Sequence, residues 1–67
     1  MKLIKLTEVM ASTGLARSTV YKYIKTGTFP KPVPQGERAV AWLENEIQEW
    51  IMERVAERDN DELHIPG

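Results

Sequence analysis

The segment TGLARSTVYKYIKTG (residues 13–27) predicts one helix, with a turn before it and a stop signal after it. Its apolar residues recur at the i, i+4, i+7 and i+8 positions of an amphipathic helix, namely Ala16, Val20, Tyr23 and Ile24. Gly27 suits the left-handed backbone that ends a helix, and Pro30 shortly after it prevents the helix from continuing. We therefore expect a helix over residues 16–26.

A shorter helix is expected immediately before this segment. Thr7 places a hydroxyl N-cap ahead of Glu8, which suits a helix that starts here. Residues 13–15 contain a glycine and break this helix. Two short helices joined by a tight turn with glycine form a helix-turn-helix unit, whose second helix enters the major groove of DNA. The sequence thus predicts this unit, with residues 16–26 as the recognition helix.

Extended segments surround these two helices. Residues 2–6 predict a short strand, and residues 31–34 are held extended because each proline restricts the residue before it. Residues 38–42 again favour a strand. Because a turn at Gly36 separates the last two segments, we expect a small β-hairpin with its tip at Gly36.

A last helix is expected to begin near Glu46, because Asn45 and Gln48 have the spacing of a variant capping box. The predicted buried stripe of this helix consists of Ile47, Trp50, Ile51 and Val55. Its outer face carries Glu46, Glu49, Glu53 and Glu57. From residue 59 onward the chain is polar, and we expect a disordered tail.

These elements together predict a mostly α-helical fold with a small β-hairpin wing, which is a winged helix-turn-helix. A chain of 67 residues forms one small domain at most, because so short a chain cannot divide its core. We assign residues 1–58 to this domain and residues 59–67 to the tail. Trp42, Trp50 and Phe29 are expected to pack in the core rather than to stack on bases.

The charges of the chain are segregated along the sequence, although the net charge is only −1. Residues 1–43 contain seven basic and two acidic residues, whereas residues 44–67 contain two basic and eight acidic residues. Such segregation creates one positive surface, which attracts a polyanion more effectively than the total charge suggests. The alternative is chance variation of charge in a small protein.

The outer face of the predicted recognition helix carries hydrogen-bond donors and no acid. With Val20 at zero and 100° per residue, Lys25, Ser18 and Lys22 lie at about 140°, 160° and 200°. Thr19 and Tyr21 flank them, and Arg17 lies at the start of the helix. Such side chains bind phosphates and base edges, which indicates double-stranded DNA as the partner. The alternative is an ordinary solvated helix face, although such faces normally mix both signs.

Two more basic residues extend this surface. Arg38 lies beside the turn at Gly36 and is expected to contact phosphate or the minor groove, as a wing does. Lys31 and Lys25 are expected to contact phosphate. The alternative is that the hairpin only covers the core. The predicted DNA-binding residues are therefore Arg17, Ser18, Thr19, Tyr21, Lys22, Lys25, Lys31 and Arg38.

Enzymatic functions lack the residues they need. The chain has no cysteine, and its single histidine, His64, lies in the predicted tail without a partner. We therefore expect no catalytic residue, no metal site and no cofactor. The longest apolar run, residues 39–43, is too short to cross a membrane. The N-terminus does not read as a signal peptide, and we expect a bacterial cytoplasmic protein that joins the nucleoid when bound to DNA.

Six runs of the sequence resemble the AlpA family of prophage regulatory proteins. They are LTEV (residues 6–9), TGL (13–15), RSTVY (17–21), GTFPKPV (27–33), RAVAW (38–42) and EIQEWI (46–51). The resemblance covers about residues 3–58. It implies a winged helix-turn-helix of the MerR and excisionase type, and a small DNA-binding transcriptional regulator of a prophage or integrated element. The family usually has serine before the arginine of its recognition helix, where this chain has Ala16.

Two alternatives and one question of assembly accompany this interpretation. The alternatives are an excisionase-type recombination directionality factor, and a protein-interaction module that docks on an integrase through the acidic helix. Arg54 and Arg58 lie in the stripe expected to be buried, so they either pair within the chain or meet the acidic face of a neighbour. We expect a monomer in solution that assembles cooperatively on repeated DNA sites.

Overall fold

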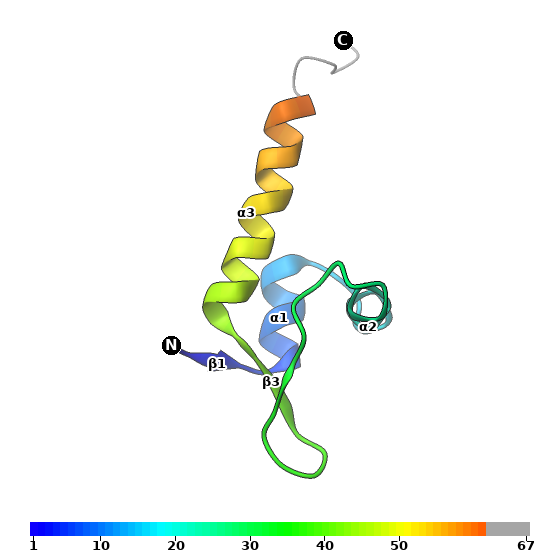
Figure 1. Cartoon of the computed structure of the whole chain (residues 1–67), viewed down its shortest axis with the longest axis vertical. Coiled ribbons are helices and arrows are strands. Elements are labelled where there is room, and N and C mark those ends of the chain that lie inside the picture. Colours follow the sequence, from blue (N-terminus) through cyan, green and yellow to red (C-terminus); the bar gives the residue numbers. More distant parts are fainter. Residues whose placement is uncertain (62–67) are drawn as a thin grey trace.

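The computed structural model describes residues 1–61 and confirms the predicted fold class. Three helices accompany a small three-stranded sheet, and the hairpin of that sheet extends from the body as a wing (Figure 1). The elements are β1 (Leu3–Ile4), α1 (Leu6–Thr13), α2 (Arg17–Lys25), β2 (Val33–Pro34), β3 (Val40–Leu43) and α3 (Glu44–Asp61). The chain therefore has a winged helix-turn-helix fold, with the α1–α2 unit beside the β2–β3 wing.

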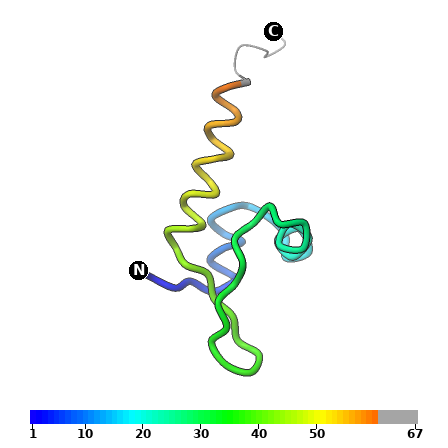
Figure 2. The backbone as a smooth tube through the Cα atoms, in the orientation of Figure 1, coloured from blue at the N-terminus to red at the C-terminus, as the bar shows by residue number. Residues whose placement is uncertain are grey.

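The sheet is antiparallel, with the strand order β1-β3-β2. The β2–β3 pair is the predicted hairpin, in which Val33 faces Ala41. On the other edge of β3, Ile4 of β1 faces Trp42. This second pairing joins strands some forty residues apart in the sequence, and it places the start of the chain beside the wing (Figure 2).

Helix α1 begins earlier than predicted, so the prediction of Thr7 as its N-cap is wrong. The helix starts at Leu6, and its N-cap residue is Lys5, which has extended backbone and forms no side-chain cap. The Lys5 carbonyl accepts the backbone N–H groups of Glu8 and Val9, each at 3.0 Å. The pairing of β1 with β3 fixes the chain up to Ile4, and the helix follows directly.

Helix α2 matches the predicted helix to within one residue at each end. It covers Arg17–Lys25, with Ala16 as N-cap and Thr26 as C-cap, and no side-chain hydrogen bond caps its N-terminal end within the described residues. Gly27 has φ of 79°, the left-handed conformation expected of it. The N–H of Thr28 then donates to the Tyr23 carbonyl at 2.9 Å, which closes the helix end.

Helix α3 begins two residues before the predicted start, and the predicted capping box is wrong. It covers Glu44–Asp61, so Asn45 lies inside its first turn. Strand β3 runs into α3 without a loop, and the N–H of Glu44 donates to the Lys2 carbonyl at 2.7 Å. Strand pairing therefore replaces the side-chain cap. The helix includes residues 59–61 of the predicted tail; residues 62–67, and with them His64, lie outside the described residues.

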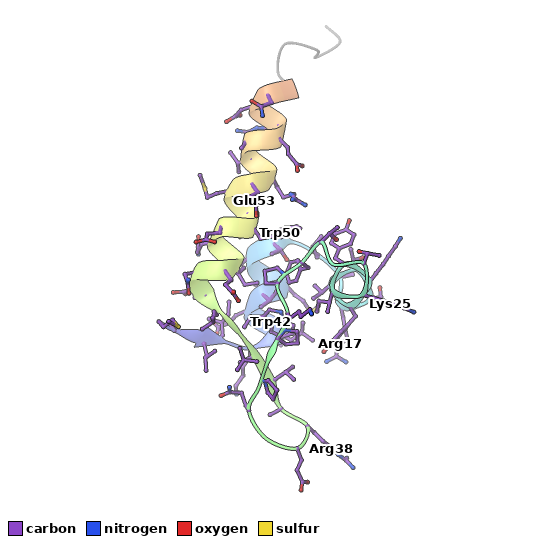
Figure 3. The ribbon with its side chains drawn as sticks, viewed as in Figure 1. Arg17, Lys25, Arg38, Trp42, Trp50 and Glu53 are labelled. Atoms are coloured by element: carbon purple, nitrogen blue, oxygen red, sulfur yellow. The ribbon has the colours of Figure 1, made fainter. Side chains whose placement is uncertain are left out.

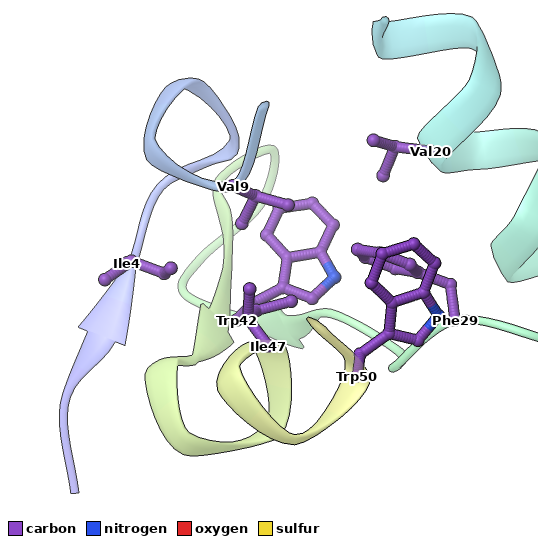
Figure 4. Packing of buried hydrophobic residues seen from close by; sticks show 7 residues of the cluster. All are labelled: Ile4, Val9, Val20, Phe29, Trp42, Ile47 and Trp50. Carbon is purple, nitrogen blue, oxygen red and sulfur yellow. The ribbon is translucent and has the colours of Figure 1, made fainter. Parts of the chain in front are cut away.

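The core gathers one or two side chains from most of the elements and is dominated by aromatic rings (Figure 4). It consists of Ile4, Val9, Val20, Phe29, Trp42, Ile47 and Trp50. The prediction that Trp42, Trp50 and Phe29 pack inside the protein is confirmed, because all three are buried. Val20 is fully buried, so α2 packs against the core through its predicted stripe.

Both indoles also hold the segment that follows α2. Nε1 of Trp42 donates to the Pro30 carbonyl at 3.0 Å, and Nε1 of Trp50 donates to the Thr28 carbonyl at 2.7 Å. Between these two bonds, Phe29 packs edge-on against Trp50 with ring centroids 4.9 Å apart. We call residues 28–30 the anchored linker, because β3 and α3 fix its backbone from two sides.

We predict that Trp42→Phe lowers the free energy of unfolding by at least about 1–3 kcal/mol, because the Pro30 carbonyl loses its donor in a partly buried place and the smaller ring leaves a void in the core. Urea unfolding followed by circular dichroism measures this change. Met52→Ala is the control; this side chain is 61% exposed, and its removal changes stability by only about 0.5 kcal/mol. Equal stability of Trp42→Phe and the wild type would contradict the role given to the indole N–H.

Candidate nucleic-acid interface

The predicted outer face of α2 is exposed in the structure. Tyr21 is 44% exposed, and Ser18, Lys22 and Lys25 are exposed beside it. Val20, on the opposite side of the helix, is fully buried. Thr19 lies at the flank and is only half-buried, so its hydroxyl is the least accessible of the predicted contacts on α2. A helix with this division presents hydroxyl and ammonium donors to any partner that approaches it from outside.

Arg17 and Tyr21 of α2 meet the wing at a groove, which we call the α2–wing groove. Arg38 and Gln35 line it from the hairpin, and Lys5 lines it from the junction of β1 and α1. Figure 3 shows Arg17 on α2 and Arg38 at the wing, which are twenty-one positions apart in the sequence. The groove therefore collects cations from three separate segments of the chain.

The other predicted cations lie outside this groove. Lys22, Lys25 and Lys31 are exposed, and none of them lines the groove within the described residues. The predicted contacts thus form two groups. Arg17, Tyr21 and Arg38 share the α2–wing groove. Lys22 and Lys25 extend the positive surface along α2, and Lys31 extends it over the segment that follows α2 in the sequence.

Acidic residues gather on α3. Glu46, Glu49, Glu53 and Glu57 line a second groove together with residues 27–30, Trp50 and Arg54. Figure 1 shows α3 rising from the sheet on the side opposite to the wing, so the acidic helix extends away from the tip that carries Arg38. The charge segregation along the sequence is therefore also a segregation in space.

The two arginines of α3 pair within the chain. The guanidinium of Arg54 lies 4.7 Å from the centroid of the Trp50 ring and 3.4 Å from a carboxylate oxygen of Glu57. Arg58 lies 2.9 Å from a carboxylate oxygen of Asp59. Exposed pairs of this kind contribute about 0–1 kcal/mol, so they leave both arginines free to exchange partners.

Three polar residues of the α2–wing groove were not singled out from the sequence. Lys5 reads there as a strand residue, Thr7 as a helix cap and Gln35 as part of a turn. All three line the groove beside Arg17 and Arg38. Only the pairing of β1 with β3 brings the start of the chain next to the wing, and no local signal in the sequence indicates that pairing.

Two other classes of site are missing from the described part of the chain. Within residues 1–61, no three His, Cys, Asp or Glu side chains come together in a way that holds a metal ion. No helix described there is long and apolar enough to cross a bilayer.

Comparisons with known proteins identify relatives of the chain. The model of one family, described as prophage CP4-57 regulatory protein (AlpA), matches residues 2–55. The chain is 42% identical over 57 residues to the uncharacterized protein ORF88 of Enterobacteria phage P4, which covers 85% of this chain and 65% of that protein. It is 36% identical over 59 residues to the DNA-binding transcriptional activator AlpA of Escherichia coli (strain K12), which covers 79% of this chain and 84% of that protein. The chain thus spans just under two thirds of the length of the phage relative.

We predict that Ala16→Ser stabilises the protein, because it supplies the side-chain acceptor that the start of α2 lacks. Ala16 is exposed and has φ of −74° and ψ of 158°, the backbone of an N-cap. The expected gain is about 1 kcal/mol, or a rise of about 4–8 °C in Tm for a domain of this size. Thermal unfolding measures the change.

Ala16→Val is the matched control, because valine adds bulk at the same position without an acceptor. It is expected to give no increase in Tm. Equal stabilisation by valine and serine would show that capping is not the cause.

Proposed function

Because the chain belongs to the prophage CP4-57 regulatory protein (AlpA) family, we propose that it binds double-stranded DNA and regulates transcription of a prophage or integrated element. The resemblance seen in the sequence is confirmed by this membership. One observation carries the proposal: the exposed donors of α2 adjoin a groove that three cations line. The name of the E. coli relative, a DNA-binding transcriptional activator, supports the same function.

In the proposed complex, α2 lies in the major groove and its exposed face reads the bases. Arg17, Ser18, Thr19, Tyr21 and Lys22 are assigned to the major groove, since lysine and arginine match the acceptors of guanine and hydroxyl groups adapt to either base pair. This placement directs the acidic helix α3 away from the duplex, since α3 extends on the side opposite to the wing.

The remaining cations are assigned to the DNA backbone. Arg38 lies at the wing and is placed on phosphate or in the minor groove. Lys25 and Lys31 are exposed and are assigned to phosphates. Such contacts fix the position of the protein on the duplex and carry no base information of their own.

Cooperative loading on repeated sites completes the proposal. A single module of this kind buries only about 600–1,000 Å² on DNA, which limits its selectivity against a genome. We infer a monomer in solution and several copies on one regulatory site. Arg54, whose ion pair with Glu57 is exposed, and Arg58, which pairs with the exposed Asp59, are the residues through which neighbours would meet.

A second candidate function is docking on a protein such as an integrase. The observation in its favour is the row of four glutamates along the groove of α3. The two functions are compatible, because DNA would bind α2 and the wing, whereas a protein partner would bind the acidic helix α3. A protein that acts only as an adaptor binds no duplex, so duplex binding separates the two.

We predict that Lys22→Ala weakens duplex binding without a decrease in stability, because the side chain is exposed on the face opposite to Val20. The probes are the DNA that flanks the gene for this chain and a random duplex of the same length. Fluorescence anisotropy over a series of salt concentrations measures the affinity and its salt dependence. The slope of log affinity against log salt concentration is negative, and its magnitude decreases by about 0.9 for each phosphate that the protein no longer neutralises. Lys22→Arg keeps the charge and is the matched control.

Binding of the wild type to neither duplex would contradict the proposed function. A large fall in Tm of Lys22→Ala would show instead that this face of α2 is packed rather than free. Weaker binding to the flanking DNA alone indicates a base contact by Lys22, and equally weaker binding to both duplexes indicates a phosphate contact.

A further inference from the structure

The α2–wing groove is cationic on every side that carries a charge. Lys5 comes from the junction of β1 and α1, Arg17 from the first turn of α2, and Arg38 from the wing. Within the described residues, no acid lines the groove. Glu8 and Glu37 are adjacent in the sequence to the lining residues Thr7 and Arg38, but they do not line the groove themselves. Three positive charges without a counter-charge attract an anion from three directions.

Uncharged donors and acceptors complete the polar rim of this groove. The exposed Thr7 contributes a hydroxyl and Tyr21 a phenol. Gln35 closes the wing, because its backbone N–H donates to the Ala39 carbonyl at 2.8 Å. The side chain of Gln35 donates through Nε2 to the Pro34 carbonyl at 3.2 Å, so its amide oxygen stays available to a ligand.

The remaining lining is apolar, which distinguishes this groove from a site for a small inorganic anion. Leu3, Leu6 and Val40 line it as well as the cations, and so does Tyr21, which brings an aromatic ring. A deoxyribose–phosphate strand offers both chemistries in alternation, since its phosphates are anionic and its sugars present C–H surface. The lining thus fits a nucleic-acid backbone better than a free phosphate.

We propose that the α2–wing groove holds one sugar–phosphate strand of the duplex, and that Lys5, Thr7 and Gln35 bind it together with Arg38, while Arg17, which also lines the groove, remains assigned to the bases of the major groove. This inference rests on the proposed function and adds the start of α1 as a third contact with DNA. The strand then runs between the recognition helix and the wing. Contacts on both sides of α2 fix its depth and rotation in the major groove.

The chain supplies a matched control for Lys5. Lys2 and Lys5 are exposed lysines on either side of the two-residue strand β1. Lys2 lies 4.0 Å from Glu44 and lines a different pocket, which Asn45 and Gln48 also line. Removal of either lysine changes the net charge equally, but only Lys5 belongs to the α2–wing groove.

The experiment measures the salt dependence of binding to a random duplex for the full chain and four variants: Lys5→Ala, Lys2→Ala, Thr7→Ala and Gln35→Ala. Lys5→Ala is expected to lower the affinity. It is also expected to reduce the magnitude of the negative log–log slope by about 0.9, because the variant neutralises one phosphate fewer. Lys2→Ala is expected to leave the slope unchanged. Thr7→Ala and Gln35→Ala are expected to lower affinity at an unchanged slope, because neutral groups release no counterions.

A second measurement identifies the phosphates themselves. Single methylphosphonate linkages, which are neutral, are placed one by one in the bound DNA. The linkage that weakens the wild type but not Lys5→Ala marks the phosphate of Lys5, and the same comparison with Arg38→Ala marks that of Arg38. Our proposal expects the two phosphates close together on one strand.

The outcomes separate this inference from the proposed function. An equal effect of Lys5→Ala and Lys2→Ala, or phosphates of Lys5 and Arg38 on different strands, overturns the groove proposal. If Lys5→Ala binds like the wild type while Lys22→Ala binds weakly, the groove proposal is wrong and DNA binding stands. If the wild type binds no duplex, both fall. Circular dichroism melting of each variant confirms that it is folded. The methylphosphonate scan uses the wild type, Lys5→Ala and Arg38→Ala.

Discussion

Two indole N–H groups hold the backbone on which the geometry of the molecule depends. The anchored linker joins α2 to the wing, and its carbonyls at Thr28 and Pro30 accept from Trp50 and Trp42. A partly buried carbonyl without a donor costs about 1–3 kcal/mol, so these bonds favour one path for the chain. Tyr23 of α2 also packs toward Trp50, with ring centroids 6.4 Å apart. The orientation of α2 relative to the sheet, and with it the shape of the α2–wing groove, follows from this aromatic cluster.

Positive and negative charges lie on different parts of this fold. The chain is nearly neutral, yet the cations of the groove and the acids of α3 lie on different parts of the molecule. A polyanion is attracted at one end and repelled at the other, so electrostatics alone orients its approach. Helix α3 keeps an acidic character because its acids outnumber Arg54 and Arg58, which pair with Glu57 and Asp59 of the same helix.

The parts of this structure that local signals encode were predicted from the sequence. The stripe of Val20, Tyr23 and Ile24 and the stop at Gly27 defined α2, because amphipathic spacing and left-handed glycine act within a few residues. The starts of α1 and α3 were predicted wrongly. Strand pairing between β1 and β3 replaced the expected side-chain caps, and pairing between distant segments leaves no local trace.

The residues of the candidate site were also predicted from the sequence only in part. The exposed donors on α2 followed from helical geometry alone, whereas Lys5, Thr7 and Gln35 became visible only once the sheet was assembled. Arg38 was predicted because it lies beside a turn in a basic segment, but its position in one groove with Arg17 required the folded chain. Local chemistry thus indicates which helix faces a partner, and tertiary pairing determines what surrounds that helix.

In the proposed complex, α2, the wing and the start of α1 together form one surface for DNA. The most direct test is a titration of ¹⁵N-labelled protein with a duplex too short to hold a second copy, followed through the backbone amide chemical shifts. Our account predicts changes concentrated at residues 5–7, 17–25 and 35–39, with the amides of residues 52–61 in α3 unaffected. Changes concentrated on α3, with α2 and the wing unaffected, would contradict it.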